Sequence, residues 1–201
     1  MTQATQATQA TQATLVAPDA AWLVVVDMQR VFSGESPWAA PDYARASAGI
    51  RRLLPAFGER VVYTRYVAPE RPEGGWVPYF EQWPFALVPA DDPLYDLTDE
   101  FDPGAHAVLT RSTFGKWGPE LVAATGGASE IVLTGVSTDC CVLSTALPAA
   151  DAGVHVVVPV DACAGASAED HQRALDAMAL YAPLIELTTV AETLGLSAPS
   201  G

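Results

Sequence analysis

The pattern that most constrains the fold lies in residues 130–151, which read EIVLTGVSTDCCVLSTALPAAD. Residues 131–133 form a short apolar run rich in β-branched side chains, which indicates a buried strand. Gly135 interrupts this run, and residues 137–139 offer three successive helix N-caps. Helical spacing follows, in Val142, Thr145, Ala146, Ala149 and Ala150. The stretch therefore predicts a strand, a sharp turn and a helix, with Cys141 in the first helical turn.

Cys141 is the expected nucleophile of this chain. Unpaired N–H groups and the helix dipole stabilise a thiolate in a first helical turn, so we expect the pKa of this thiol to be lowered. The alternative is that Cys141 is simply a small buried residue, as most cysteines are. Cys140 points elsewhere, because one helical step turns by about 100°. Cys163 ends another apolar run and is expected to pack in the core.

Apolar runs of strand length alternate with helical patterns along the chain. Strands are expected at 21–26, 60–66, 106–110, 131–133, 154–160 and 183–190, and helices at 42–57, 121–124 and 168–180 and after Cys141. This alternation predicts an α/β fold of three layers, in which right-handed crossovers place helices on both faces of a parallel sheet.

The chain is long enough for one domain with a substantial core, which we expect over residues 15–201. Residues 1–14 contain four copies of Thr-Gln-Ala and are expected to form a disordered tail. This tail has neither the basic region nor the apolar core of a signal peptide.

Two further chemical groups follow expected strands. Asp27 comes directly after the run at 21–26, and Lys116 lies a few residues beyond the strand at 106–110. The carboxyl ends of parallel strands are where open α/β sheets bind ligands. A helix-capping carboxylate and a solvated surface lysine remain the alternatives. Gln29 is a weaker candidate for positioning a substrate.

Residues 67–103 form a long segment without a clear helical or strand pattern. Segments of this length inside a domain usually cover a site. This one carries several aromatic residues, and we expect Trp76, Trp83 and Phe85 to line a substrate pocket. The alternative is that these rings only attach the segment to the core.

Charge and cysteine content limit the partners. The chain has 24 acidic and 10 basic residues, a formal charge of −14, so nucleic acid and anionic membranes are not expected partners. No apolar run is long enough to cross a bilayer. Three cysteines, two of them adjacent, do not form a disulfide framework, which favours a reducing, cytoplasmic location.

Three stretches resemble the motifs of the isochorismatase-like cysteine hydrolases. They are LVVVDMQ at 23–29, RSTFGK at 111–116 and GVSTDCCVLSTA at 135–146. That superfamily includes nicotinamidases, N-carbamoylsarcosine amidohydrolases, biuret and ureidoacrylate hydrolases and streptothricin hydrolases. The motifs occur in the family's order and span nearly all of the chain after residue 20.

The resemblance implies specific roles for these residues. The family's catalytic triad falls on Asp27, Lys116 and Cys141. The oxyanion hole falls on the backbone N–H groups of Ser137 and Cys141, with a cis peptide bond between Val136 and Ser137. It also implies a six-stranded, Rossmann-like sheet and a homodimer or homotetramer.

One branch of the family does not fit. Nicotinamidases bind a metal through an Asp and two His near the second strand, whereas this region has no histidine. The chain's three histidines, His106, His155 and His171, are widely separated. We therefore expect neither a metal nor another cofactor, and no Gly-x-Gly-x-x-Gly follows the first strand to suggest a dinucleotide.

The sequence thus predicts a metal-independent hydrolase that cleaves a C–N bond of a small amide, lactam or carbamoyl compound through a thioester. The acidic surface and the aromatic segment make a cationic amide a candidate substrate. Isochorismatase activity, which does not need the cysteine, is the first alternative. A non-catalytic binding protein is the second, and rapid alkylation of one thiol at neutral pH would argue against it.

Overall fold

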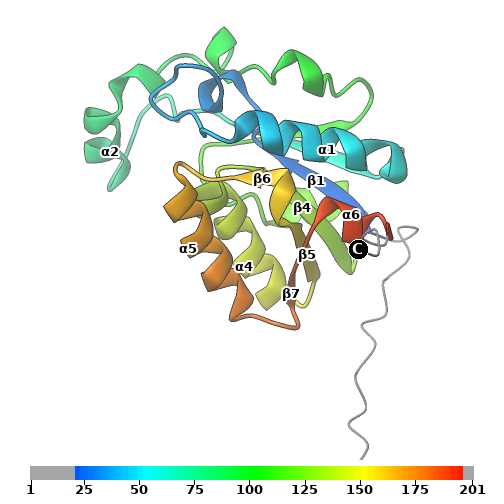
Figure 1. Cartoon of the computed structure of the whole chain (residues 1–201). Helices are drawn as coiled ribbons and strands as arrows, with labels where there is room; N and C mark the ends of the chain where they lie inside the picture. The colour runs from blue at the N-terminus through cyan, green and yellow to red at the C-terminus, as the bar shows by residue number, and fades with distance from the viewer. Residues whose placement is uncertain (1–20, 197–201) are drawn as a thin grey trace, which may run out of the picture.

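The computed structural model describes residues 21–196 (Figure 1). The expected disordered tail, residues 1–14, lies outside the described residues. Among residues 21–196, no helix combines the length and the apolar character needed to cross a membrane.

A parallel sheet forms the centre of the fold, as predicted. Its strands are β1 (Trp22–Val26), β2 (Val61–Tyr66), β3 (Ala107–Arg111), β4 (Glu130–Val136), β5 (His155–Pro159), β6 (Cys163–Ala164) and β7 (Ile185–Thr188). Six of them run in the order β3-β2-β1-β4-β5-β7, and the two-residue strand β6 pairs with β4 beside this path. All the pairings are parallel, and Val24 of β1 is in register with Val62 on one side and Leu133 on the other.

Helices cover both faces of this sheet. They are α1 (Tyr43–Phe57), α2 (Trp76–Gln82), α3 (Pro119–Ala124), α4 (Leu143–Asp151), α5 (Ala168–Ala179) and α6 (Val190–Thr193). In Figure 1, α1 and α6 lie against one face and α4 and α5 against the other.

The two cores follow from strand alternation. Leu23 and Val25 of β1 point into the core under α1, whereas Val24 and Val26 point into the core under α3, α4 and α5. Successive side chains of a strand face opposite sides of its sheet, so one buried strand supplies both cores. The helix expected at 42–57 is α1, which buries Ala46, Ile50, Leu53 and Phe57.

The segment at 67–103 is more regular than expected. It contains α2 and three short 3-10 helices, Pro84–Ala86, Pro93–Tyr95 and Asp99–Phe101. Each element buries an aromatic or alanine side chain: Phe80, Ala86, Tyr95 and Phe101. These anchors hold the segment against the end of the sheet where β1 and β2 finish.

Candidate active site

The sheet places Asp27 and Cys141 at its topological switch point. The chain builds β2 and β3 on one side of β1, then returns to build β4 on the other side. Asp27 directly follows β1, and Cys141 lies five residues after the end of β4. A crevice forms where the connections from neighbouring strands diverge, which is why open α/β sheets bind ligands there.

Close backbone packing fixes the ends of these two strands. Gly135 of β4 is in register with Val26 of β1. It has a φ of +111°, and a Cβ atom there would lie 2.1 Å from the Val26 carbonyl oxygen. Only glycine allows this contact. Asp27 itself has a φ of +51°, which is uncommon for a residue with a side chain.

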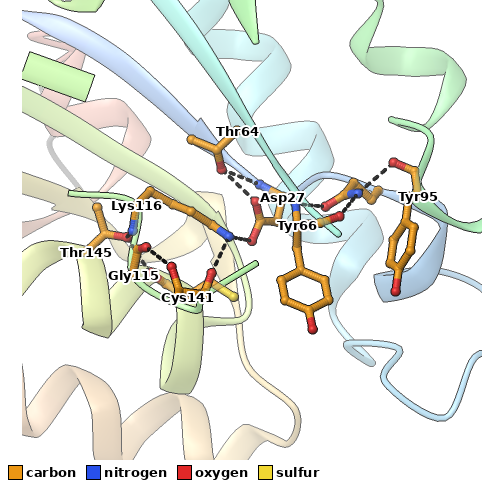
Figure 2. A network of polar contacts seen from close by, with 10 residues as sticks. Asp27, Thr64, Tyr66, Tyr95, Gly115, Lys116, Cys141 and Thr145 are labelled. Carbon is orange, nitrogen blue, oxygen red and sulfur yellow. Dashed lines mark hydrogen bonds and ion pairs between the residues drawn. The ribbon is translucent and has the colours of Figure 1, made fainter. Parts of the chain in front are cut away.

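Asp27 is completely buried and its two carboxylate oxygens have different partners. Oδ1 accepts a hydrogen bond of 2.6 Å from the Thr64 hydroxyl of β2. Oδ2 lies 2.9 Å from Nζ of Lys116, and no other partner for it occurs among residues 21–196. Oδ2 is therefore the oxygen that remains available to accept a proton (Figure 2).

Lys116 reaches Asp27 because its loop docks on α4, far from β3. The Lys116 N–H donates a hydrogen bond of 2.9 Å to the Thr145 hydroxyl, which in turn donates to the Cys141 carbonyl at 2.7 Å. Gly115 sits so close to α4 that a Cβ atom would lie 2.6 Å from the Ser144 carbonyl oxygen. The Lys116 ammonium, fully buried, also donates to the Thr113 carbonyl at 2.9 Å.

Cys141 lies in a widened first turn rather than in the α-helical turn that we expected. Residues Thr138–Val142 form a π-helical turn that leads into α4. The Val142 N–H bonds to the Ser137 carbonyl five residues back, at 3.1 Å. The Val136–Ser137 peptide bond is cis, as the resemblance implied. Single π turns of this kind occur frequently at functional sites.

The protonation of Cys141 differs from the expectation. Burial first, and then the negative charge of Asp27, raise the pKa of the Cys141 thiol well above its ordinary value, while Lys116 acts in the opposite direction. The expected effect of the helix N-terminus is outweighed because the thiol is only 2% exposed and a carboxylate stands beside it. The resting group is a neutral thiol next to a carboxylate and an ammonium.

A cavity of about 180 Å³ opens above this thiol. Six aromatic residues line it, together with the turn that contains Cys141: Phe32, Trp38, Tyr66, Tyr79, Trp83, Phe114, Ser137, Asp139, Cys140 and Cys141. Asp139 is the one charged side chain among the described lining residues. Small-molecule sites typically combine mostly apolar walls with a few polar groups in this way.

The aromatic residues expected in this pocket divide into two groups. Trp83 lines the cavity, but Trp76 and Phe85 do not. Phe85 packs behind Trp83 with 6.4 Å between ring centroids, and Trp76 packs against Phe114 at 5.3 Å. Both therefore pack against residues of the cavity wall without lining the cavity themselves. Sequence reasoning did not single out Trp38, which lies in the loop after β1.

Gln29 also differs from the expectation. It is completely buried and does not line the cavity. Its side-chain amide accepts from the Tyr66 N–H at 2.7 Å, donates to the Tyr66 carbonyl at 2.8 Å, and donates to the Tyr95 carbonyl at 2.6 Å. With these bonds made, the Gln29 side chain holds the end of β2.

Ser137 and Asp139 shape the turn before Cys141. The Ser137 hydroxyl donates a 3.0 Å hydrogen bond to Asp139 Oδ1, and the same oxygen accepts from the Ala166 N–H at 2.8 Å. Asp139 thereby ties the cis-bonded turn to the loop after β6. Ser137, Asp139 and Cys141 all line the cavity.

The donor set does not suit a metal ion. Residues 67–103, which follow β2, contain no histidine. His155 contacts Glu130, and His171 contacts the Thr138 hydroxyl. Within the part of the chain that the structure describes, no three His, Cys, Asp or Glu side chains are grouped as metal ligands.

Residues 21–192 match the isochorismatase domain. The matched residues include most of the chain and every strand of the sheet. The chain belongs to the isochorismatase family. No curated protein sequence matches it.

Solved structures with the same fold include several hydrolases of this family. A cysteine hydrolase from Pseudomonas syringae pv. phaseolicola 1448A is 21% identical, with a TM-score of 0.76 over 89% of this chain and 92% of that one. N-carbamoylsarcosine amidase from Thermoplasma acidophilum is 23% identical, with a TM-score of 0.67 over 84% and 95%. The nicotinamidase/pyrazinamidase of Acinetobacter baumanii is 20% identical, with a TM-score of 0.71 over 86% and 97%. At these identities the likeness establishes the shared fold.

Proposed function

We propose that this chain is a metal-independent amidohydrolase in which Cys141 attacks the carbonyl of a small, cationic amide. The observation that carries the proposal is the buried group of three at the base of the aromatic cavity. There, the Cys141 thiol, which lines the cavity, lies beside the Asp27 carboxylate, and the Asp27 Oδ2 atom is 2.9 Å from the ammonium of Lys116. This arrangement supplies a nucleophile, a proton acceptor and a compensating positive charge at one point.

The proposed reaction begins with transfer of the thiol proton to Asp27 as the sulfur attacks the amide carbon. The raised pKa of the thiol suits this order, because the proton leaves only when the carbon–sulfur bond forms. The Lys116 ammonium stabilises the negative charge that develops on the sulfur and on the carbonyl oxygen during the attack.

The attack turns the carbonyl oxygen into an oxyanion. The backbone N–H groups of Ser137 and Cys141 are the proposed donors to it, and one such donor is typically worth about 3 kcal/mol in the transition state. The intermediate collapses when Asp27 returns its proton to the leaving amine and the C–N bond breaks. Water, deprotonated by Asp27, then hydrolyses the thioester and restores the thiol.

The preference for a cationic substrate rests on the cavity wall. The faces of Trp38, Tyr79 and Trp83 can attract a cation through their ring quadrupoles, and Asp139 adds a negative charge. The formal charge of −14 would also steer cations towards the protein. The cavity volume suits a small amide, or the reacting end of a longer one.

The test is a panel of cationic amides, each with a neutral analogue of equal size, assayed for release of ammonia or amine. The proteins are the wild type, Cys141→Ala and the control Cys163→Ala, which alters a buried cysteine outside the cavity. We expect turnover by the wild type and the control, none by Cys141→Ala, faster turnover of the cationic members, and no effect of a chelator. Full activity in Cys141→Ala would instead indicate chemistry that does not use the thiol.

A further inference from the structure

Tyr66, the last residue of β2, carries a hydroxyl group that the protein leaves without a partner. The side chain is only 1% exposed, and its oxygen is buried with no hydrogen-bond partner among the described residues. The backbone N–H and carbonyl of the same residue are both bonded to the side chain of Gln29 (Figure 2). Buried polar groups in folded proteins nearly always have a partner, so an exception requires an explanation.

Tyr95 shows that the neighbourhood can satisfy such a group. Its ring centroid lies 5.9 Å from that of Tyr66, and it is equally buried. The Tyr95 hydroxyl, however, donates a hydrogen bond to the Ala86 carbonyl. Of the two adjacent buried tyrosines, one is therefore paired within the fold and the other is not. A phenylalanine at position 66 would fill the same space without burying an unpaired oxygen.

The side chain that carries this hydroxyl lines the cavity above Cys141. Tyr66 is among the residues that line it, and the Lys116 ammonium lies 5.4 Å from the centre of its ring. The ring is held by an edge contact with Trp38 at 5.9 Å, and the backbone is held by the amide of Gln29. The hydroxyl is thus fixed in position before any substrate arrives, which reduces the entropy lost on binding.

The hydroxyl also keeps its proton. Burial above all raises the pKa of Tyr66 far above its ordinary value, and the nearby Asp27 carboxylate acts in the same direction. A neutral hydroxyl can both donate and accept a hydrogen bond. It can therefore pair with either a nitrogen or an oxygen of a bound molecule.

We infer that Tyr66 is a substrate-contacting residue whose hydroxyl takes its hydrogen-bond partner from the substrate. Tyr66 thereby selects amides with a polar atom beside the scissile group over amides that have carbon there. The inference rests on the proposed function and names a specificity determinant for it. Sites that hydrogen-bond a substrate atom reject analogues lacking that atom, because the site's own polar group then stays unpaired.

The first test compares Tyr66→Phe with the matched control Tyr95→Phe. The substrates are pairs that differ at the atom bonded to the scissile carbonyl, such as phenylurea with phenylacetamide. In Tyr66→Phe we expect kcat/KM for the polar member of a pair to fall by about 10- to 100-fold, the scale of one buried hydrogen bond, while the carbon member changes little. Tyr95→Phe should leave this ratio unchanged.

The melting temperature distinguishes a substrate-contacting tyrosine from a structural one, because only the loss of a structural hydrogen bond should lower it. Tyr66→Phe should match or exceed the wild-type Tm, because no hydrogen bond within the protein is lost. Tyr95→Phe should lower the Tm, because the Ala86 carbonyl loses its donor. A drop in Tm for Tyr66→Phe equal to that of Tyr95→Phe, or an unchanged substrate ratio, overturns the inference.

Binding to catalytically inactive protein separates this inference from the proposed hydrolysis. The same compounds are titrated by calorimetry into Cys141→Ala and into the double variant Cys141→Ala/Tyr66→Phe. A 10-fold or greater loss of affinity for the polar members supports the role of Tyr66, even if the wild type hydrolyses none of them. Equal affinities, or no binding of any member to Cys141→Ala, overturn it, even if the wild type is an active amidase.

Discussion

Nζ of Lys116 lies 2.9 Å from Oδ2 of Asp27, and both side chains are completely buried. Each buried charge is compensated by the other, so the loss of one leaves an uncompensated charge in the core, which is strongly destabilising. The pair joins the end of β1 to the loop that docks on α4, so it links the two halves of the site. Its integrity should therefore affect both stability and activity.

The first prediction concerns this ion pair. Lys116→Met should lower the free energy of unfolding by about 3–5 kcal/mol, because it strands the Asp27 charge in the core. The double variant Lys116→Met/Asp27→Asn should recover part of that loss. Urea unfolding at pH 7 measures both. Equal losses in the single and double variants would contradict the assigned cause.

The second prediction concerns Gln29. Replacing it with Leu removes the partners of the Tyr66 N–H, the Tyr66 carbonyl and the Tyr95 carbonyl, and each buried group left unpaired costs about 1–3 kcal/mol. We expect a large fall in stability by urea unfolding. The control Gln82→Leu changes an exposed residue at the end of α2 and should be nearly neutral. A stable Gln29→Leu protein with a raised KM would favour direct substrate contact instead.

The third prediction concerns thiol reactivity. Because burial and Asp27 raise the pKa of Cys141, its labelling by iodoacetamide should be slow at pH 7 and should accelerate as the pH rises. Mass spectrometry after timed labelling from pH 7 to pH 10 gives the rate for each cysteine. This profile reverses our expectation from sequence of rapid alkylation at neutral pH, and rapid labelling of Cys141 at pH 7 would restore that expectation.

The fourth prediction concerns stability in alkali. Burial raises the pKa of Cys163 to about 12 and, with Asp139, that of Cys140 to about 11. In the unfolded chain the pKa of these thiols is about 8.5. The folded state therefore holds the protons more tightly, so this contribution to stability is complete below about pH 8.5 and is lost as the pH rises towards 12.

Urea unfolding between pH 7.5 and pH 10.5 should accordingly show a decline that begins near the ordinary pKa of a thiol. Cys163→Ala should lower the overall stability but make this decline shallower. An unchanged slope in that variant would assign the decline to other groups, such as Tyr79, whose pKa burial raises to about 12.

The fifth prediction concerns the cavity wall. Trp83 lines the cavity, whereas Phe85 packs behind it. Trp83→Leu should reduce the ratio of kcat/KM for a cationic amide over its neutral analogue by about 2- to 30-fold, the range of one cation–π contact. Phe85→Leu should leave the ratio unchanged. A similar reduction in both variants would point to general loosening of the wall.

The sequence predicted the position of a site residue where that residue directly follows a recognisable strand. Asp27 and Cys141 could be placed at the same end of the sheet because each follows a buried apolar run. The parallel sheet followed from the alternation of strands and helices in the same way. Lys116 needed the resemblance as well, since its strand, β3, is separated from β1 by β2.

Features set by packing between distant segments could not be predicted in this way. The neutral state of Cys141 depends on how deeply the loops bury it, and no local pattern encodes that depth. The segment at 67–103 has no single period, so nothing distinguished Trp83, which faces the cavity, from Trp76 and Phe85. The role of Gln29 in holding the end of β2 was not evident from the sequence, because its partners lie on β2 and in the 3-10 helix at Pro93–Tyr95.

The Thr145 hydroxyl, which joins the Lys116 N–H to the Cys141 carbonyl, has a consequence for synthesis of the chain. The ribosome makes Asp27 and Lys116 before Cys141, and the bond that seats the lysine loop comes four residues later still. The side chains that surround the thiol are therefore all present only after Thr145 has been added to the chain.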